Sequence, residues 1–148
     1  MRDICGRIRS EYPQAEGMLR AKGNRVNFGY VFQLASARMK YGQCLEKEEH
    51  GCKEARELYQ KSIDDFQYLL DLTDGKQMAV HESLYKAWFF LGKNYMEEGK
   101  ENGAEDCWEN AMKYVRQLKD SGKLYENATL KEMKKIIPDL REICQKSD

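Results

Sequence analysis

The residue types best suited to catalysis or metal binding are two histidines and five cysteines. Cys44, His50 and Cys52 are close enough in the sequence to share a metal ion at a corner between two helices. They have no clear fourth ligand and lack the usual spacing of a zinc site, so we expect no metal there. His81 belongs to no known nucleophile motif, and we interpret it as a partly buried, hydrogen-bonded side chain. The sequence predicts no catalytic residue, no metal and no cofactor.

The sequence also lacks the patterns typical of a phosphate-binding loop and of a catalytic pair of carboxylates. The glycine-containing segments 23–24 and 99–103 have neither a preceding strand nor the fixed glycine spacing of a phosphate-binding loop. Acidic residues are plentiful, but on helix faces they pair with nearby lysines. We therefore predict that the chain is not an enzyme. A bound metal or a deep polar cleft around His81 would favour the alternative, an enzyme on an all-α scaffold.

The balance of acidic and basic residues limits the classes of molecule that the protein is expected to bind. Lysine plus arginine and aspartate plus glutamate balance at 25 each, so no overall field draws the protein to phosphates or anionic lipid. Acidic residues gather over 97–109 and basic residues over 123–135, and we interpret both stretches as solvated helix faces. Nucleic acid is therefore not an expected partner.

Length, hydropathy and cysteine usage indicate one cytoplasmic domain. The 148 residues, with 41% hydrophobic and 34% charged side chains, are expected to fold as a single domain over 1–148. No apolar run is long enough to cross a bilayer, and the first residues are too polar for a signal-peptide core, so we expect no membrane insertion. An odd number of cysteines without a Cys-x-x-Cys pair suits reduced thiols, as in the cytoplasm.

Apolar residues recur at three- and four-residue steps along most of the chain, and no alternating strand pattern is present. These stripes predict two helical hairpins, about 28–72 and 77–119, and two flanking helices, 1–22 and 129–146. Gly75 and Gly122 mark helix ends, because glycine accepts the left-handed backbone conformation that closes a helix. The predicted fold class is all-α.

Two local signals describe the last helix. Thr129, with Glu132 three residues later, forms a capping box in which each side chain satisfies a backbone N–H at the start of a helix. Pro138 removes a backbone donor and clashes with the preceding turn. We therefore expect this helix to start at Thr129 and to kink or break between Ile137 and Asp139.

The second hairpin carries large and small residues at a fixed spacing. They are Trp88, Leu91, Gly92, Tyr95, Ala104, Trp108 and Ala111. Gly92 and Ala104 are small where two antiparallel helices must approach closely, and the aromatic residues face the partner helix. This segment closely resembles the tetratricopeptide repeat, although Arg116 stands near the place of the family's closing proline.

A looser copy of the repeat lies upstream. Ala55, Tyr59 and Ser62 stand 49 residues before the matching positions of the second hairpin. The resemblance implies antiparallel hairpins stacked as a short right-handed solenoid with capping helices, because one hairpin cannot bury its own apolar face.

The resemblance also implies a binding face. In such repeats the first helix of each hairpin lines a concave groove that holds an extended peptide or a partner helix. In the segment 84–99 four residues fall opposite the core stripe and are expected to face that groove: Lys86, Phe89, Lys93 and Met96. We expect Phe89 to be an exposed anchor between lysines, with packing on a neighbouring helix as the alternative. Because Phe90 occupies the place of a cation in the family's chaperone clamp, no such clamp is predicted.

The leading functional hypothesis is an adaptor or scaffold that binds a peptide or helix of a protein partner. The alternative is a ligand- or peptide-sensing regulatory domain of a larger protein. Self-association as a homo-oligomer stays open at this stage.

Overall fold

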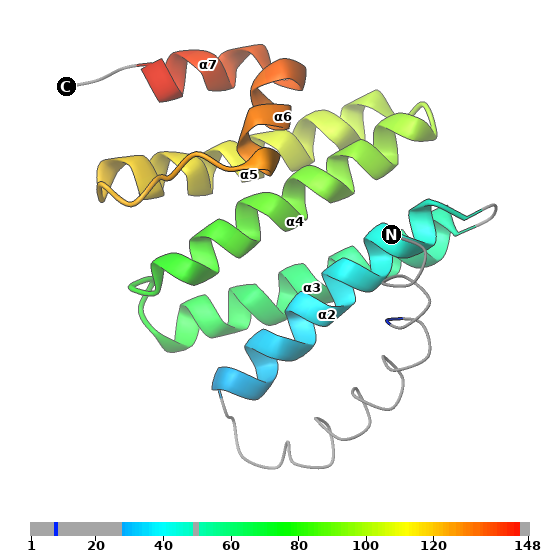
Figure 1. Ribbon diagram of the computed structural model, residues 1–148, viewed down its shortest axis with the longest axis horizontal. Coiled ribbons are helices and arrows are strands. Elements are labelled where there is room, and N and C mark those ends of the chain that lie inside the picture. The colour runs from blue at the N-terminus through cyan, green and yellow to red at the C-terminus, as the bar shows by residue number, and fades with distance from the viewer. Residues whose placement is uncertain (1–7, 9–27, 49–50, 146–148) are drawn as a thin grey trace. The chain divides into compact units, whose positions relative to one another are not determined.

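The computed structural model describes Ile8, residues 28–48 and residues 51–145. Within those residues the chain forms six α-helices and no strand (Figure 1). They are α2 (Phe28–Glu46), α3 (Cys52–Leu72), α4 (Met78–Glu97), α5 (Glu101–Asp120), α6 (Ala128–Ile136) and α7 (Pro138–Gln145). The predicted all-α class is confirmed. The helix expected over 1–22 lies outside the described residues.

The chain divides into two compact units at Gly75 and Lys76. The first unit contains the α2–α3 hairpin, and the second contains α4, α5, α6 and α7. The expectation that both units belong to one domain, and the stacking of the hairpins as a right-handed solenoid, stay predictions.

The α2–α3 hairpin is held by an aromatic residue on a glycine and by polar contacts. Tyr59 of α3 is fully buried, and a β-carbon added to Gly42 of α2 would lie 2.8 Å from its Cε1 atom. The hydroxyl of Ser62 donates a hydrogen bond to the carbonyl of Ala35 (2.8 Å). The guanidinium of Arg38, buried in α2, pairs with Asp65 of α3. The two helices can therefore approach closely only because residue 42 has no side chain.

The α4–α5 hairpin repeats this arrangement. A β-carbon on Gly92 of α4 would lie 2.6 Å from Cδ1 of Trp108 on α5, and Ala104 is fully buried. The predicted roles of Gly92 and Ala104 as small residues in the hairpin core are confirmed. Trp108 is 9% exposed, whereas Trp88 is only half-buried. The pair of Gly42 and Tyr59 corresponds to that of Gly92 and Trp108, although no sequence pattern had indicated a role for Gly42.

Glycines in the left-handed conformation end two of the helices, as predicted. After α3 the backbone reaches φ 72° at Gly75, and after α5 it reaches φ 69° at Gly122. Thr73 also donates its hydroxyl to the carbonyl of Leu69 (3.0 Å), which satisfies one of the last acceptors of α3. The second helix of each hairpin thus ends at a glycine turn.

The start of α6 differs from the prediction. The N-cap residue is Asn127, whose side-chain oxygen accepts a hydrogen bond from the backbone N–H of Leu130 (2.9 Å). The predicted capping box of Thr129 and Glu132 is therefore wrong, because helix geometry begins one residue earlier and Glu132 contacts Lys93 of α4 instead. An Asn side chain reaches the same backbone donors as a threonine hydroxyl.

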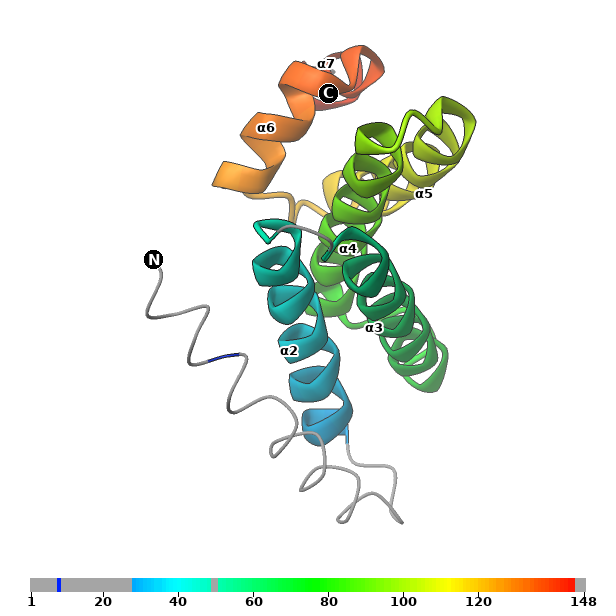
Figure 2. The same cartoon turned by 90° about the vertical axis from the view of Figure 1, so that its right-hand side faces the viewer.

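Pro138 ends α6 and begins α7, so the predicted break is confirmed. Ile137 between the two helices is extended, with φ −110° and ψ 98°. The two short helices therefore meet at a corner, which is visible in both views (Figure 1, Figure 2). Leu130, Met133 and Leu140 are buried and attach this corner to the rest of its unit.

Candidate functional site

The face of α4 that was expected to line a groove is covered by α6. Tyr85 and Lys93 stand eight residues apart on α4, so both lie on one stripe of the helix with Phe89 between them. The side-chain amide of Asn127 donates a hydrogen bond to the hydroxyl of Tyr85 (2.7 Å), and Lys93 pairs with Glu132 of α6. These two contacts place α6 along the stripe.

Phe89 is fully buried. The ammonium group of Lys93 lies 5.5 Å from the centre of its ring, while the same group pairs with Glu132. The expectation that Phe89 is an exposed anchor is therefore wrong, and the alternative of packing inside the protein is correct. Tyr85 and Lys93, one turn to either side of Phe89, both contact the α6 segment, and no pattern within the segment 84–99 announces this return of α6 to α4.

The other three residues of the predicted face do not gather at one open surface. Lys86 is half-buried and lies 3.5 Å from Glu82 in its own helix, whereas Met96, near the end of α4, is 41% exposed. Lys93 is engaged by α6 as described. A partner-binding role for Lys86, Phe89, Lys93 and Met96 stays a prediction, and their arrangement does not favour it.

A different surface of this unit is hollowed, between α5 and the corner of α6 and α7. Two hollows, of about 580 Å³ and 320 Å³, share Glu109, Met112 and Asp139 as lining residues. We call them together the α5 groove. Its apolar lining comes from two residues of α5 and three of the corner: Trp108, Met112, Ile136, Ile137 and Pro138.

The apolar lining forms a floor with one raised side. Trp108, Met112 and Ile137 are each less than a tenth exposed, so they present only part of their surface at the bottom of the groove. Ile136 is 37% exposed and stands at the edge. Such a floor gives an apolar side chain of another molecule a place to leave water.

Carboxylates surround this floor. Glu105 and Glu109 of α5 line one side, and Asp139 of α7 lines the other. Among the described residues none of these three carboxylates forms an ion pair, whereas Asp65, Glu126 and Glu132 each pair with a cation. The groove therefore carries negative charge that its own unit does not neutralise.

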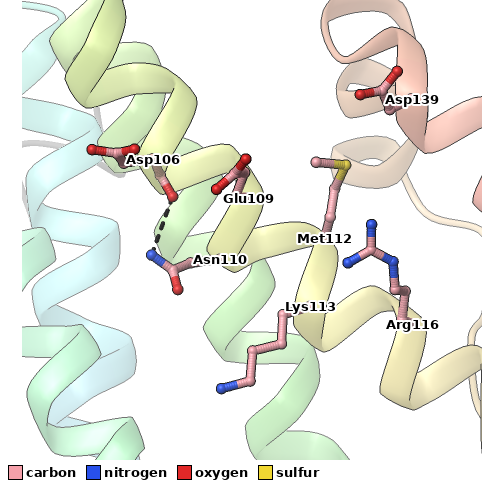
Figure 3. A pocket seen from close by; sticks show the side chains of 7 residues that line it. All are labelled: Asp106, Glu109, Asn110, Met112, Lys113, Arg116 and Asp139. Carbon is pink, nitrogen blue, oxygen red and sulfur yellow. Dashed lines mark hydrogen bonds between the residues drawn. The ribbon is translucent and has the colours of Figure 1, made fainter.

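The larger hollow has mixed charge, because Asp106, Glu109 and Asp139 line it beside two cations. Lys113 and Arg116 line it one and two turns beyond Glu109. In Figure 3, Met112 and Arg116 extend from α5 toward the side of α7, while Lys113 points away to the other side. The Lys113 ammonium group lies 5.4 Å from the centre of the Tyr114 ring. The groove is thus acidic at the Glu105 end and of mixed charge at the Arg116 end.

Burial shifts the pKa of two titratable side chains in this unit. Burial raises the pKa of the Cys107 thiol to about 12, so the thiol stays protonated and is a poor nucleophile. Burial also raises the pKa of Tyr85 to about 12. His81 is buried, with its ring centre 5.8 Å from that of Tyr114. These groups do not share a cavity with the α5 groove.

The described residues contain neither a metal-binding cluster nor a membrane-spanning helix. In that part of the chain no three histidine, cysteine, aspartate or glutamate side chains are grouped so as to hold a metal ion. His50 lies outside the described residues, and Cys44 and Cys52 take part in no disulfide there. No helix among the described residues has the length and apolar character to cross a bilayer.

The sequence contained a signal for the α5 groove. Glu105 and Glu109 are four residues apart, as are Trp108 and Met112, and the second pair is offset from the first by three residues, so acidic and apolar side chains share an edge of the helix. The sequence analysis interpreted the acidic stretch as a solvated face. Only the corner at Pro138 converts that face into one wall of a groove.

Comparisons with known proteins add no relative: no family model, curated protein or solved structure matches this chain.

Proposed function

We propose that this chain is a protein-interaction module that holds a segment of a partner protein in the α5 groove. The observation that carries the proposal is a hollow with an apolar floor of Trp108, Met112 and Ile137, each less than a tenth exposed, and a frame of charged side chains. Interfaces for peptide segments combine an apolar centre with a polar rim in this way. A buried anchor on the floor would supply affinity, and the rim would supply orientation.

The hairpins themselves support the same class of function. Gly42 with Tyr59 and Gly92 with Trp108 repeat one helix-packing device, as expected of tetratricopeptide-like hairpins. Proteins built from such hairpins bind partners through their surfaces rather than through catalytic residues. In this chain α6 already covers the face of α4 that a tetratricopeptide-like groove would use. The α5 groove is therefore the better candidate for the binding surface.

Panning a peptide-display library on the full chain tests the proposal. Enriched peptides should bind the parent chain and should lose about tenfold in affinity to Ile136→Asn, since removal of an apolar contact at an interface typically costs about 1 kcal/mol or more. Ile136 is 37% exposed, so this change should leave the fold intact. Leu72→Asn is a matched control, because Leu72 is 50% exposed on α3, outside the groove.

Two results would contradict the proposed function. One is a library from which no peptide is enriched above an unrelated helical protein. The other is a set of enriched peptides that bind Ile136→Asn as tightly as the parent chain, with unfolding curves that show both proteins folded.

A further inference from the structure

We propose that the segment held in the α5 groove is basic. An apolar side chain of that segment rests on the floor of Met112 and Trp108, and its lysine or arginine side chains pair with Glu105, Glu109 and Asp139. This inference rests on the function proposed above and names the class of partner for the same site.

The carboxylates of the groove are complementary in charge to a basic segment. Glu105 and Glu109 are one turn apart on α5, and Asp139 faces the same hollow from α7. Within the described part of the chain no cation pairs with any of them. The whole chain is neutral, with 25 acidic and 25 basic residues, so the local excess is not a by-product of an acidic composition. A bound cation would supply the missing partner.

Among the described residues the fold uses neither Glu105 nor Glu109 in an ion pair, not even Glu109 with Lys113 one turn later. Like charges one turn apart on a helix destabilise it by roughly 0.2–0.5 kcal/mol. The helix dipole favours acidic residues only in the first turn, which contains Glu101, whereas Glu105 and Glu109 lie beyond it. Asp139 does lie in the first turn of α7. The dipole therefore accounts for Asp139 but not for Glu105 and Glu109.

The charges along the groove also indicate in which direction the basic segment lies. The groove runs along α5 from Glu105 to Arg116, which is roughly 16 Å at 1.5 Å per residue. An extended segment of about five residues spans that distance. Its cations belong at the end near Glu105, because Arg116, which extends toward the side of α7 in Figure 3, would repel them at the other end. The sign of the field at the acidic end also disfavours nucleic acid and anionic membranes.

A charge reversal in the groove, compared with a matched charge reversal on α3, separates this inference from the proposed function. The peptide library is panned on the parent chain, on Glu105→Lys/Glu109→Lys and on the control Glu54→Lys/Glu57→Lys, which reverses two exposed acidic residues of α3. Peptides enriched by the parent and the control should carry an apolar residue beside two or more lysines or arginines. The groove variant should lose these peptides and enrich neutral or acidic ones.

The enriched basic peptides, once synthesised, allow a titration by fluorescence anisotropy. Glu105→Gln/Glu109→Gln should weaken binding about tenfold at low ionic strength, and the difference should shrink as salt is added, because exposed charges are screened. Glutamine keeps the size and the helix propensity of glutamate, so a folding defect is not expected.

Each remaining outcome decides between the two proposals. If no peptide is enriched, the proposed function and the basic partner both fail. The enriched peptides could instead depend on Ile136, lack basic residues and bind the glutamine variant as tightly as the parent chain. That result would support the proposed function and contradict the inference that the partner segment is basic. Sedimentation that shows a dimer dissociated by Glu105→Lys/Glu109→Lys would make a second copy of this chain the occupant, and would overturn the proposal of a partner segment.

Discussion

The indole of Trp108 lies directly against the α-carbon of Gly92, in the space where any other residue would place its side chain. The phenol ring of Tyr59 lies against Gly42 in the same way. Both contacts join the two helices of a hairpin. Because packed interiors have little free space, these glycines set how closely the helices approach.

Substitution of the two glycines should therefore destabilise the protein although alanine favours helices. A β-carbon at residue 92 would lie 2.6 Å from Cδ1 of Trp108, so the overpacking cost of about 1–3 kcal/mol should exceed the gain in helix propensity of about 1 kcal/mol. Gly103→Ala is the control, because its β-carbon would lie 3.2 Å from Tyr95. Urea unfolding should rank Gly92→Ala below Gly42→Ala, and both below Gly103→Ala. Equal stability of all three would show that the helices can separate freely.

The pair of Arg38 and Asp65 makes a second prediction. Asp65→Ala leaves a guanidinium group that is only 7% exposed without its carboxylate, which should cost about 2–4 kcal/mol. The double variant Arg38→Met/Asp65→Ala should recover part of this loss, because methionine needs no counter-charge. A thermodynamic cycle of the three variants measures the coupling. Additive effects would mean that the two side chains do not interact.

Phe89→Ala tests the corrected position of this side chain. Since Phe89 is fully buried, its removal should lower the free energy of unfolding by about 3–5 kcal/mol. Phe90→Ala, at the half-buried neighbour, should cost less. Thermal unfolding compares the two. A Phe89→Ala protein with an unchanged melting temperature would restore the exposed anchor that the sequence suggested.

Asn127 has two roles, which can be separated. Asn127→Ala removes the cap of α6 and the hydrogen bond to Tyr85, so we expect a loss of about 1–2 kcal/mol and faster hydrogen exchange in α6. Asn127→Ser keeps an acceptor for the cap and should lose less. Thr129→Ala should have little effect on stability. If Thr129→Ala were the more damaging change, the capping box predicted from the sequence would be correct after all.

The raised pKa of Tyr85 predicts a loss of stability in alkali. The unfolded chain releases this proton near pH 10 and the folded chain near pH 12, so unfolding releases a proton in that interval and is favoured as the pH rises. The slope from this group is at most about 1.4 kcal/mol per pH unit. Cys107 adds a loss of the same sign from about pH 9.

Urea unfolding at several pH values isolates the tyrosine. Tyr85→Phe in a Cys107→Ala background should be less stable at pH 8, because Asn127 loses its acceptor, yet should lose less stability between pH 10 and 12 than Cys107→Ala alone. Parallel curves for the two proteins would contradict the assigned pKa.

Local patterns in the sequence determined the helices and the core of each hairpin. The spacing of Gly92, Ala104 and Trp108 predicted a close antiparallel pair, and Pro138 predicted a break, because each signal acts within a few turns of its own position. Gly42 escaped notice since the connection after α2 is longer than the one after α4, which obscured its correspondence with Gly92.

The tertiary structure alone decided which helix faces stay open. Periodicity assigns Phe89 and Lys93 to a face of α4, but Asn127 and Glu132, some forty residues later in the sequence, cover that face. In the same way Glu105 and Glu109 are an exposed edge of α5 until the corner at Pro138 places Asp139 opposite them. A sequence pattern records which side chains lie together on one helix. What covers them depends on the direction in which the chain returns, and that is set by turns and by contacts between distant residues.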